Sequence, residues 1–248
     1  MYTEAKYNKA EEFLKELEGD DEKLVKSKQR VKDAGEVFTP RWVVRDMLDL
    51  DEIKDMSFEL DTTFLEPACG NGNFIIQILV RKLMSVSAEA FDIDVARSVA
   101  SIYGVDIAED NVKETRARMM NAIKHFYADN KMELRREIEC SLWYILYRNI
   151  ILGNTLEYKK YAENYSDAEK SAGISIVDTR VTCTDTKDND LLVSEWKFLG
   201  DHVHRSEYMI KGMVDERFST VNRDYETVKL DRLYKVTDKG QFDINDFI

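Results

Sequence analysis

The residues best suited to chemistry form one run, Glu66–Phe74, which reads Glu-Pro-Ala-Cys-Gly-Asn-Gly-Asn-Phe. An apolar strand pattern precedes this run, and an apolar helix pattern follows it at once. Gly70 and Gly72 let the backbone turn tightly and approach a ligand, and the next helix points free N–H groups at the turn. Ligands of open α/β sheets bind beyond the carboxyl ends of the strands, so the run predicts a nucleotide-type cofactor site. Its spacing fits neither a dinucleotide fingerprint nor a phosphate-binding loop.

A second acidic residue, Asp106, lies near the end of the apolar run 102–107. An ionised carboxylate has two acceptor oxygens, so it can accept hydrogen bonds from both hydroxyls of a ribose. The alternative role is to cap the next helix, but Asp110 stands at a better position for that. We therefore expect Asp106 to contact the cofactor.

Hydrophobic periodicity supplies the elements that would position these residues. Helix patterns cover 3–18, 22–33, 39–48, 75–84, 111–128 and 132–148, and strand patterns cover 64–65, 102–107 and 149–156. Thr39 is expected to cap the third helix, with Pro40 at its first helical position. The alternation of strands and helices predicts an α/β domain with a mostly parallel sheet, helices on both faces and an N-terminal helical arm.

Two segments in this order carry a family resemblance: Gly35–Pro40, which reads Gly-Glu-Val-Phe-Thr-Pro, and the run Glu66–Phe74. Together they resemble the S-adenosylmethionine-dependent DNA methyltransferases that modify adenine, including the modification subunits of type I restriction systems. The only two prolines of the chain, Pro40 and Pro67, both lie in these segments. A matching pair of segments is more specific than either segment alone.

The resemblance implies a Rossmann-like methyltransferase fold, a three-layer sandwich, with S-adenosylmethionine as the cofactor. The first segment would fold over the methionine end of the cofactor, and Ile107 would lie against its adenine ring. Asn154 replaces the acid that the family places near the adenine amino group, and its carbonyl is still an acceptor. The implied cofactor-binding residues are Phe38, Thr39, Pro40, Glu66, Pro67, Ala68, Gly70, Gly72, Phe74, Asp106, Ile107 and Asn154.

The resemblance covers residues 35–156 and fades beyond them. We therefore expect a helical arm at 1–34 and a methyltransferase-like domain at 35–248, divided into a cofactor-binding half, 35–156, and a diverged half, 157–248. Strand patterns in the diverged half cover 174–177, 179–184 and 191–198.

The catalytic motif of the family, a polar residue followed by Pro-Pro and an aromatic residue, is absent, because no two prolines are adjacent. In that motif a polar side chain and a carbonyl hold the target amino group, and the ring stacks on the flipped base. Three alternatives follow. The chain is inactive or acts with a partner; a diverged loop supplies Ser194 as the acceptor and Trp196 as the stacking ring; or 242–247 is a remnant of the motif, completed by another chain.

Composition limits the class of protein. The 248 residues are 44% hydrophobic, enough for a core, and the three cysteines form neither a disulfide framework nor a zinc pattern. His202 and His204 could share one side of a strand, but with no third ligand nearby we expect no metal site. The chain starts without a signal peptide pattern and contains no apolar run long enough to span a membrane, so a cytoplasmic, soluble protein is expected.

A net charge of −12 argues against a broad DNA-binding face on this chain alone. The most basic stretch, residues 22–33, is either a solvated helix face or a local phosphate contact. The resemblance implies DNA as the partner, contacted through this stretch or through a partner subunit.

The function implied by the resemblance is that of an S-adenosylmethionine-binding, DNA adenine methyltransferase-like protein of a restriction–modification, phage or plasmid system. The alternative is a catalytically inactive binding or regulatory subunit that needs a partner. A third reading, methylation of a small molecule or of a protein, is opposed by the Phe-Thr-Pro segment.

Overall fold

The computed structural model describes residues 2–19, 22–161, 163, 190–210 and 221–236. The strands expected at 174–177 and 179–184, and the segment 242–247, lie outside these residues. In the described part of the chain, no helix is both long and apolar enough to cross a membrane.

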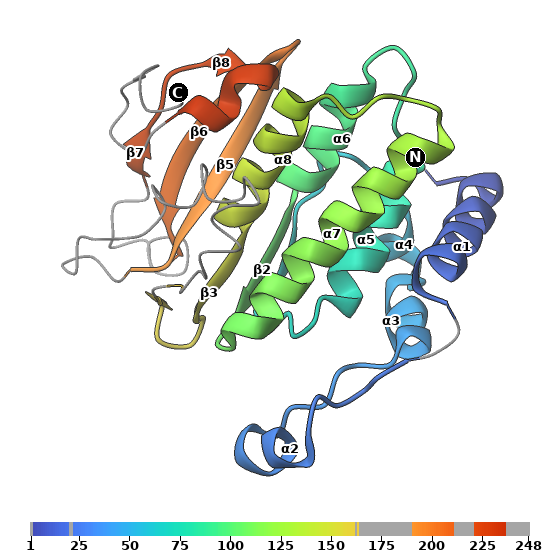
Figure 1. Cartoon of the computed structure of the whole chain (residues 1–248), viewed down its shortest axis with the longest axis vertical. Coiled ribbons are helices and arrows are strands. Elements are labelled where there is room, and N and C mark those ends of the chain that lie inside the picture. Colours follow the sequence, from blue (N-terminus) through green and yellow to red (C-terminus); the bar gives the residue numbers. More distant parts are fainter. Residues whose placement is uncertain (1, 20–21, 162, 164–189, 211–220, 237–248) are drawn as a thin grey trace.

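The first sheet contains the three strands that the sequence predicts. β1 (Phe64–Glu66), β2 (Ile102–Asp106) and β3 (Ile150–Asn154) are parallel, and the short β4 (Lys159–Lys160) adds an antiparallel edge. The order is β1-β2-β3-β4, so the carboxyl ends of the three parallel strands meet at one edge (Figure 1).

Four helices connect these strands: α5 (Asn73–Leu83), α6 (Phe91–Ala100), α7 (Glu109–Asp129) and α8 (Arg136–Asn149). Both crossovers step the same way along the sheet, so the right-handed rule places all four helices on one face. Figure 1 shows them together in front of β2 and β3. The helices bury a continuous apolar core against this face of the sheet.

The opposite face differs from the three-layer prediction. Val105 and Ile151, which point to that face, pack against Leu191 and Ile210 rather than against a second helical layer. The mixed α/β architecture with parallel strands is confirmed, whereas helices on both faces are not seen in the described ranges.

A second, antiparallel sheet follows in the chain. It contains β5 (Leu192–Leu199), β6 (His202–Met209), β7 (Val221–Asp224) and β8 (Val228–Lys229), and it leads into a 3-10 helix, η2 (Leu230–Lys235). The Tyr103 hydroxyl donates to the Ser194 carbonyl at 2.6 Å, and the Ser141 hydroxyl donates to the Leu230 carbonyl at 2.6 Å. Apolar side chains of this sheet and η2 join the same core as α5–α8.

The N-terminal region contains α1 (Glu4–Glu18), α2 (Lys28–Ala34), α3 (Arg41–Leu48) and α4 (Asp51–Ser57). α1 packs on the body and buries Ala10 and Phe13 in the core. α2 projects away from the body (Figure 1). Pro40 occupies the N-cap of α3, and no side chain caps that helix, so the expected cap by Thr39 is wrong.

A buried arginine holds α3 and α4 against α5. Arg81 is fully buried and donates to the Leu48 carbonyl at 2.9 Å, to the Ser57 hydroxyl at 3.3 Å and to Asp49 at 2.7 Å. Burying a guanidinium is costly unless its donors find partners. The three acceptors lie at the ends of α3 and α4 and take both Nη groups, whereas Nε has no partner among the described residues.

We predict that Arg81→Met destabilises the fold by about 3 kcal/mol, because it leaves the acceptors of α3 and α4 without their donor. The matched control is Arg45→Met. The Arg45 side chain is 44% exposed and forms a surface ion pair with Asp46 at 3.5 Å, so its loss should cost less than about 0.5 kcal/mol. Urea unfolding followed by circular dichroism measures both values. Equal losses would contradict the anchoring role of Arg81.

Candidate functional site

The glycine turn, residues 67–72, bends over the carboxyl end of β2. The N–H of Cys69 donates to the Val105 carbonyl at 2.9 Å, and the N–H of Gly70 donates to the carboxylate of Asp106 at 2.8 Å. The run Glu66–Phe74 and Asp106 are therefore neighbours, although a pair of helices separates them in the chain.

Both glycines of the turn have left-handed backbone conformations, with φ of +52° at Gly70 and +90° at Gly72. A Cβ on Gly72 would lie 2.8 Å from the Thr115 side chain, and one on Gly70 would lie 3.1 Å from the ring of Phe38. Glycine is thus required for two reasons, the positive φ and the close packing of α7 and the Phe38 segment against the turn.

Asp106 anchors the turn and the start of α7 together. Beside the bond from Gly70, its carboxylate accepts the N–H of Ala108 at 2.8 Å and the side-chain amide of Asn111 at 3.2 Å. A carboxylate has roughly four acceptor positions, so about one remains for a ligand hydroxyl. The neighbouring Ile107 is 62% exposed, which leaves its side chain open to a ring.

The segment with the second family-like motif lies directly on the glycine turn. Phe38 is buried against Gly70, and its N–H donates to the Leu24 carbonyl at 2.8 Å. The Thr39 carbonyl accepts the side-chain amide of Asn73 at 2.8 Å. The two motifs that the sequence singles out therefore form one site.

Two buried acceptor atoms near Asp106 have no hydrogen-bond partner, Oε2 of Glu36 and Oδ1 of Asn111. The Asn111 amide donates to the other Glu36 oxygen at 2.8 Å, and Arg30 pairs with that same oxygen at 2.5 Å. Buried polar atoms are rarely left unsatisfied, so two unfilled acceptors beside the turn fit a ligand that brings hydroxyl or ammonium donors.

The charges at the sheet edge are negative and uncompensated. Burial raises the pKa of Glu66, and the N–H of Ala68 opposes part of that rise. Neither Glu66 nor Asp106 has an ion pair within the described ranges. Burial and these two carboxylates raise the pKa of the Cys69 thiol, so Cys69 stays protonated and is not a nucleophile. Such an edge favours a cationic ligand.

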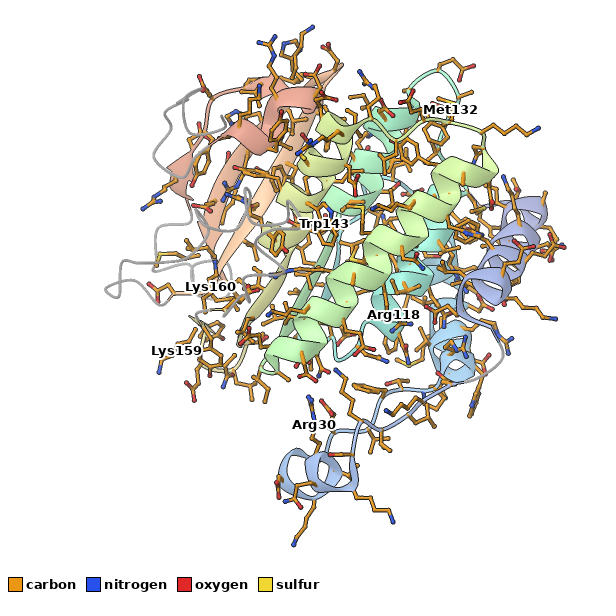
Figure 2. All side chains as sticks on the ribbon, viewed as in Figure 1. Arg30, Arg118, Met132, Trp143, Lys159 and Lys160 are labelled. Carbon is orange, nitrogen blue, oxygen red and sulfur yellow. The ribbon has the colours of Figure 1, made fainter. Side chains whose placement is uncertain are left out.

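Arg118 on α7 is a site residue that the sequence analysis missed (Figure 2). Its guanidinium donates to the Asn71 carbonyl at 2.5 Å, to Asn73 Oδ1 at 3.0 Å and to both oxygens of Glu18 on α1. One side chain thus ties the glycine turn to two helices. Nothing in a helix pattern distinguishes such an arginine from one that faces solvent.

Asn154 uses its carbonyl differently from the sequence expectation. Its Oδ1 accepts the N–H groups of Leu156 at 3.0 Å and Glu157 at 3.2 Å, so this acceptor forms the local turn. The next residue, Thr155, donates its hydroxyl to the Pro67 carbonyl at 2.8 Å, which joins the exit of β3 to the glycine turn.

Ser194 and Trp196 lie elsewhere, so the premise for their catalytic role is wrong. Their strand, β5, pairs antiparallel with β6 in the second sheet and does not end at the edge that holds the glycine turn. Ser194 is buried and accepts a hydrogen bond from Arg205 at 2.9 Å. Trp196 donates to Asn149 at 2.9 Å, and Asn149 precedes β3, at the opposite end of the parallel strands. We do not retain them as acceptor and stacking ring.

One group of side chains has the composition of a metal site. Ligand atoms of Glu16, His125 and Asp129 lie within 4.8 Å of one another, on α1 and α7. The two carboxylates are exposed, and His125 packs edge-on against Phe13, so the group also fits a surface ion pair. We assign no metal to it.

The family model for N-6 DNA methylases matches residues 22–168, more than half of the chain. The chain belongs to this family. The match contains the Phe38 segment, the glycine turn, Asp106 and all of the parallel strands, and it ends before the second sheet. No curated protein and no solved structure matches the chain.

We predict that Gly72→Ala destabilises the chain by about 1–3 kcal/mol more than Gly200→Ala. Both positions have positive φ, so a Cβ at either one costs about 1–2 kcal/mol of stability in this left-handed backbone region. Only Gly72 also brings the new Cβ against Thr115, whereas nothing lies within 4 Å at Gly200. Chemical denaturation measures the difference, and equal losses would show that the packing against Thr115 is not tight.

Proposed function

We propose that this N-6 DNA methylase family chain binds S-adenosylmethionine at the glycine turn and serves in methylation of adenine in DNA. The observation that carries the proposal is the meeting of the Phe38 segment, the turn and Asp106 at one sheet edge. That edge holds two carboxylates without an ion pair and two unfilled buried acceptors. The cofactor is a sulfonium cation with ribose hydroxyls and an ammonium group, which matches this chemistry.

Each group has a role in the proposal. The free acceptor position of Asp106 takes a ribose hydroxyl, and the exposed Ile107 lies against the adenine ring. Glu66 favours the positive charges of the cofactor, and the unfilled oxygen of Glu36 accepts a hydrogen bond from one of its donors. The other residues expected at the site, Thr39, Pro40, Pro67, Ala68, Gly70, Gly72, Phe74 and Asn154, shape the turn and its rim.

When bound, the cofactor would supply the methyl group by in-line displacement from its sulfonium sulfur to the amino nitrogen of adenine, leaving S-adenosylhomocysteine while the amino group loses a proton to an acceptor. This step depends on orientation and on acceptors for the amino protons more than on a strong base. The protein's contribution is to hold the methyl donor at the sheet edge in one orientation. The setting that we propose is a restriction–modification, phage or plasmid system in the cytoplasm.

A second candidate is a cofactor-binding subunit that methylates only with a partner. It is favoured because Ser194 and Trp196 are engaged by Arg205 and Asn149, away from the glycine turn. The chain also has no adjacent prolines to form the family's catalytic motif. Methylation of adenine-containing DNA by the purified chain would decide between the two candidates.

We predict that S-adenosylmethionine and its demethylated product, S-adenosylhomocysteine, bind the purified chain. Asp106→Ala should lose about 1–3 kcal/mol of binding free energy, because a ligand hydroxyl loses its acceptor and the turn loses its anchor. Isothermal titration calorimetry measures both ligands.

The matched control for Asp106→Ala is Glu133→Ala, an exposed acid outside the site. It should bind both ligands as the wild type does. Absence of binding heat and of any thermal shift with either ligand would refute the cofactor site.

We predict weak binding of duplex DNA that falls steeply with salt, because the net charge of −12 opposes phosphate. In the basic stretch, Asp110 and Glu36 neutralise Lys26 and Arg30, whereas Lys23, Lys28 and Lys32 are exposed and have no ion pair in the described part. Replacing these three lysines by glutamine should weaken binding and flatten its salt dependence by about one unit per lost phosphate contact.

The control for this DNA experiment replaces three exposed lysines on other surfaces, Lys9, Lys15 and Lys131, by glutamine. Fluorescence anisotropy across a salt series compares the two triple variants. The same loss in both would mean that only the net charge matters and that the stretch around α2 makes no specific contact.

A further inference from the structure

The outer edge of β1 has no strand beside it among the described residues. The N–H of Phe64 donates to the Ser101 carbonyl at 2.9 Å, toward β2. Backbone groups alternate in direction along a strand, so the N–H and C=O of Leu65 point away from β2. An unpaired edge of this kind is a template for another strand.

An apolar groove runs beside this edge. Its volume is about 190 Å³, and side chains of α3, α4, β1, β2 and α5 form its walls. Four of these side chains are unusually exposed for their size: Met47 at 48%, Leu50 at 59%, Ile53 at 36% and Leu65 at 49%. Glu66, the acid next to the glycine turn, also lines the groove. The groove therefore leads from the α3–α4 surface to the candidate cofactor site.

The surroundings of the groove are strongly acidic. Residues 41–66 contain eight acidic and three basic side chains, and Arg81 and Arg97 pair with two of the acids, Asp49 and Asp61, which leaves an excess of acids. Asp51, Glu52 and Asp55 on α4 are exposed or half-buried, with no ion pair in the ranges that the structure describes. A second copy of the chain would bring the same negative surface to the contact, and like charges across an interface oppose association. Charge complementarity instead favours a basic occupant.

We propose that a basic protein partner lays an extended, apolar segment in this groove and adds a strand to the free edge of β1. Main-chain bonds to Leu65 would give affinity, and alternate side chains would fill the apolar groove. A strand parallel to β1 would end beside Glu66. If the proposed function also holds, the partner delivers its next residues to the edge where the methyl donor is held.

The test uses a fluorescein-labelled peptide of alternating valine and threonine with two lysines at each end, titrated with the full chain and followed by anisotropy. Saturable binding is expected. Leu65→Lys, which places a cation in the groove, should weaken binding about tenfold or more. The matched control is Leu199→Lys, a 64% exposed leucine of the second sheet, which should bind the peptide as the wild type does.

Two further peptides test the mode of binding. Replacing the flanking lysines by glutamate should weaken binding about tenfold or more, because the peptide then carries the same charge as the groove surface. Replacing the central valine by proline should weaken it by a similar factor, because proline has no backbone N–H to donate. Ile53→Lys, on α4, provides a second groove variant should Leu65→Lys fail to fold.

No peptide binding, or binding that the groove variants leave unchanged, would overturn the proposal. Self-association of the wild type that Leu65→Lys reverses would assign the edge to a second copy, and this also overturns it. Calorimetry with S-adenosylhomocysteine on the same samples keeps the two proposals separate. Peptide binding without cofactor binding would support the docking surface and refute only the cofactor site.

Discussion

The carboxylate of Asp106 holds together the segments that form the site. It accepts N–H groups from Gly70 in the turn and from Ala108 before α7, and the side-chain amide of Asn111 within α7. The carboxyl end of a parallel strand is the one place where a side chain can reach both the preceding turn and the following helix. The glycine turn is therefore fixed to β2 and α7 at once.

A second set of contacts joins the N-terminal region to this center. Arg118 connects the turn to Glu18 of α1, and the Thr39 carbonyl accepts the amide of Asn73. These contacts cross large sequence separations, so the site forms only when the N-terminal segment has packed against α5 and α7. Loosening α1 would consequently loosen the turn, even though α1 lies outside the sheet.

The negative charge of this chain favours cationic ligands and disfavours anionic ones. The sheet edge carries Glu66 and Asp106 without a compensating cation, and the groove along β1 lies in an acidic surface. A cationic cofactor and a basic partner are both favoured by such a field, whereas the DNA backbone is repelled. Under the proposed function, the methyl donor would lie on this chain and a partner would make most of the phosphate contacts.

The sequence by itself determined the local features of this protein: the glycine turn within Glu66–Phe74, the acid at Asp106, the three parallel strands, and three of their four connecting helices, since no pattern predicted α6. These follow from turn chemistry and periodicity, which depend on neighbouring residues. Only the tertiary structure decided that Arg118 holds the turn, that Thr155 joins the exit of β3 to the glycine turn, and that Trp196 packs at the opposite end of the sheet. Strand and helix patterns do not say which sheet a strand joins or which polar side chain finds a distant partner, because those outcomes depend on packing between segments far apart in the chain.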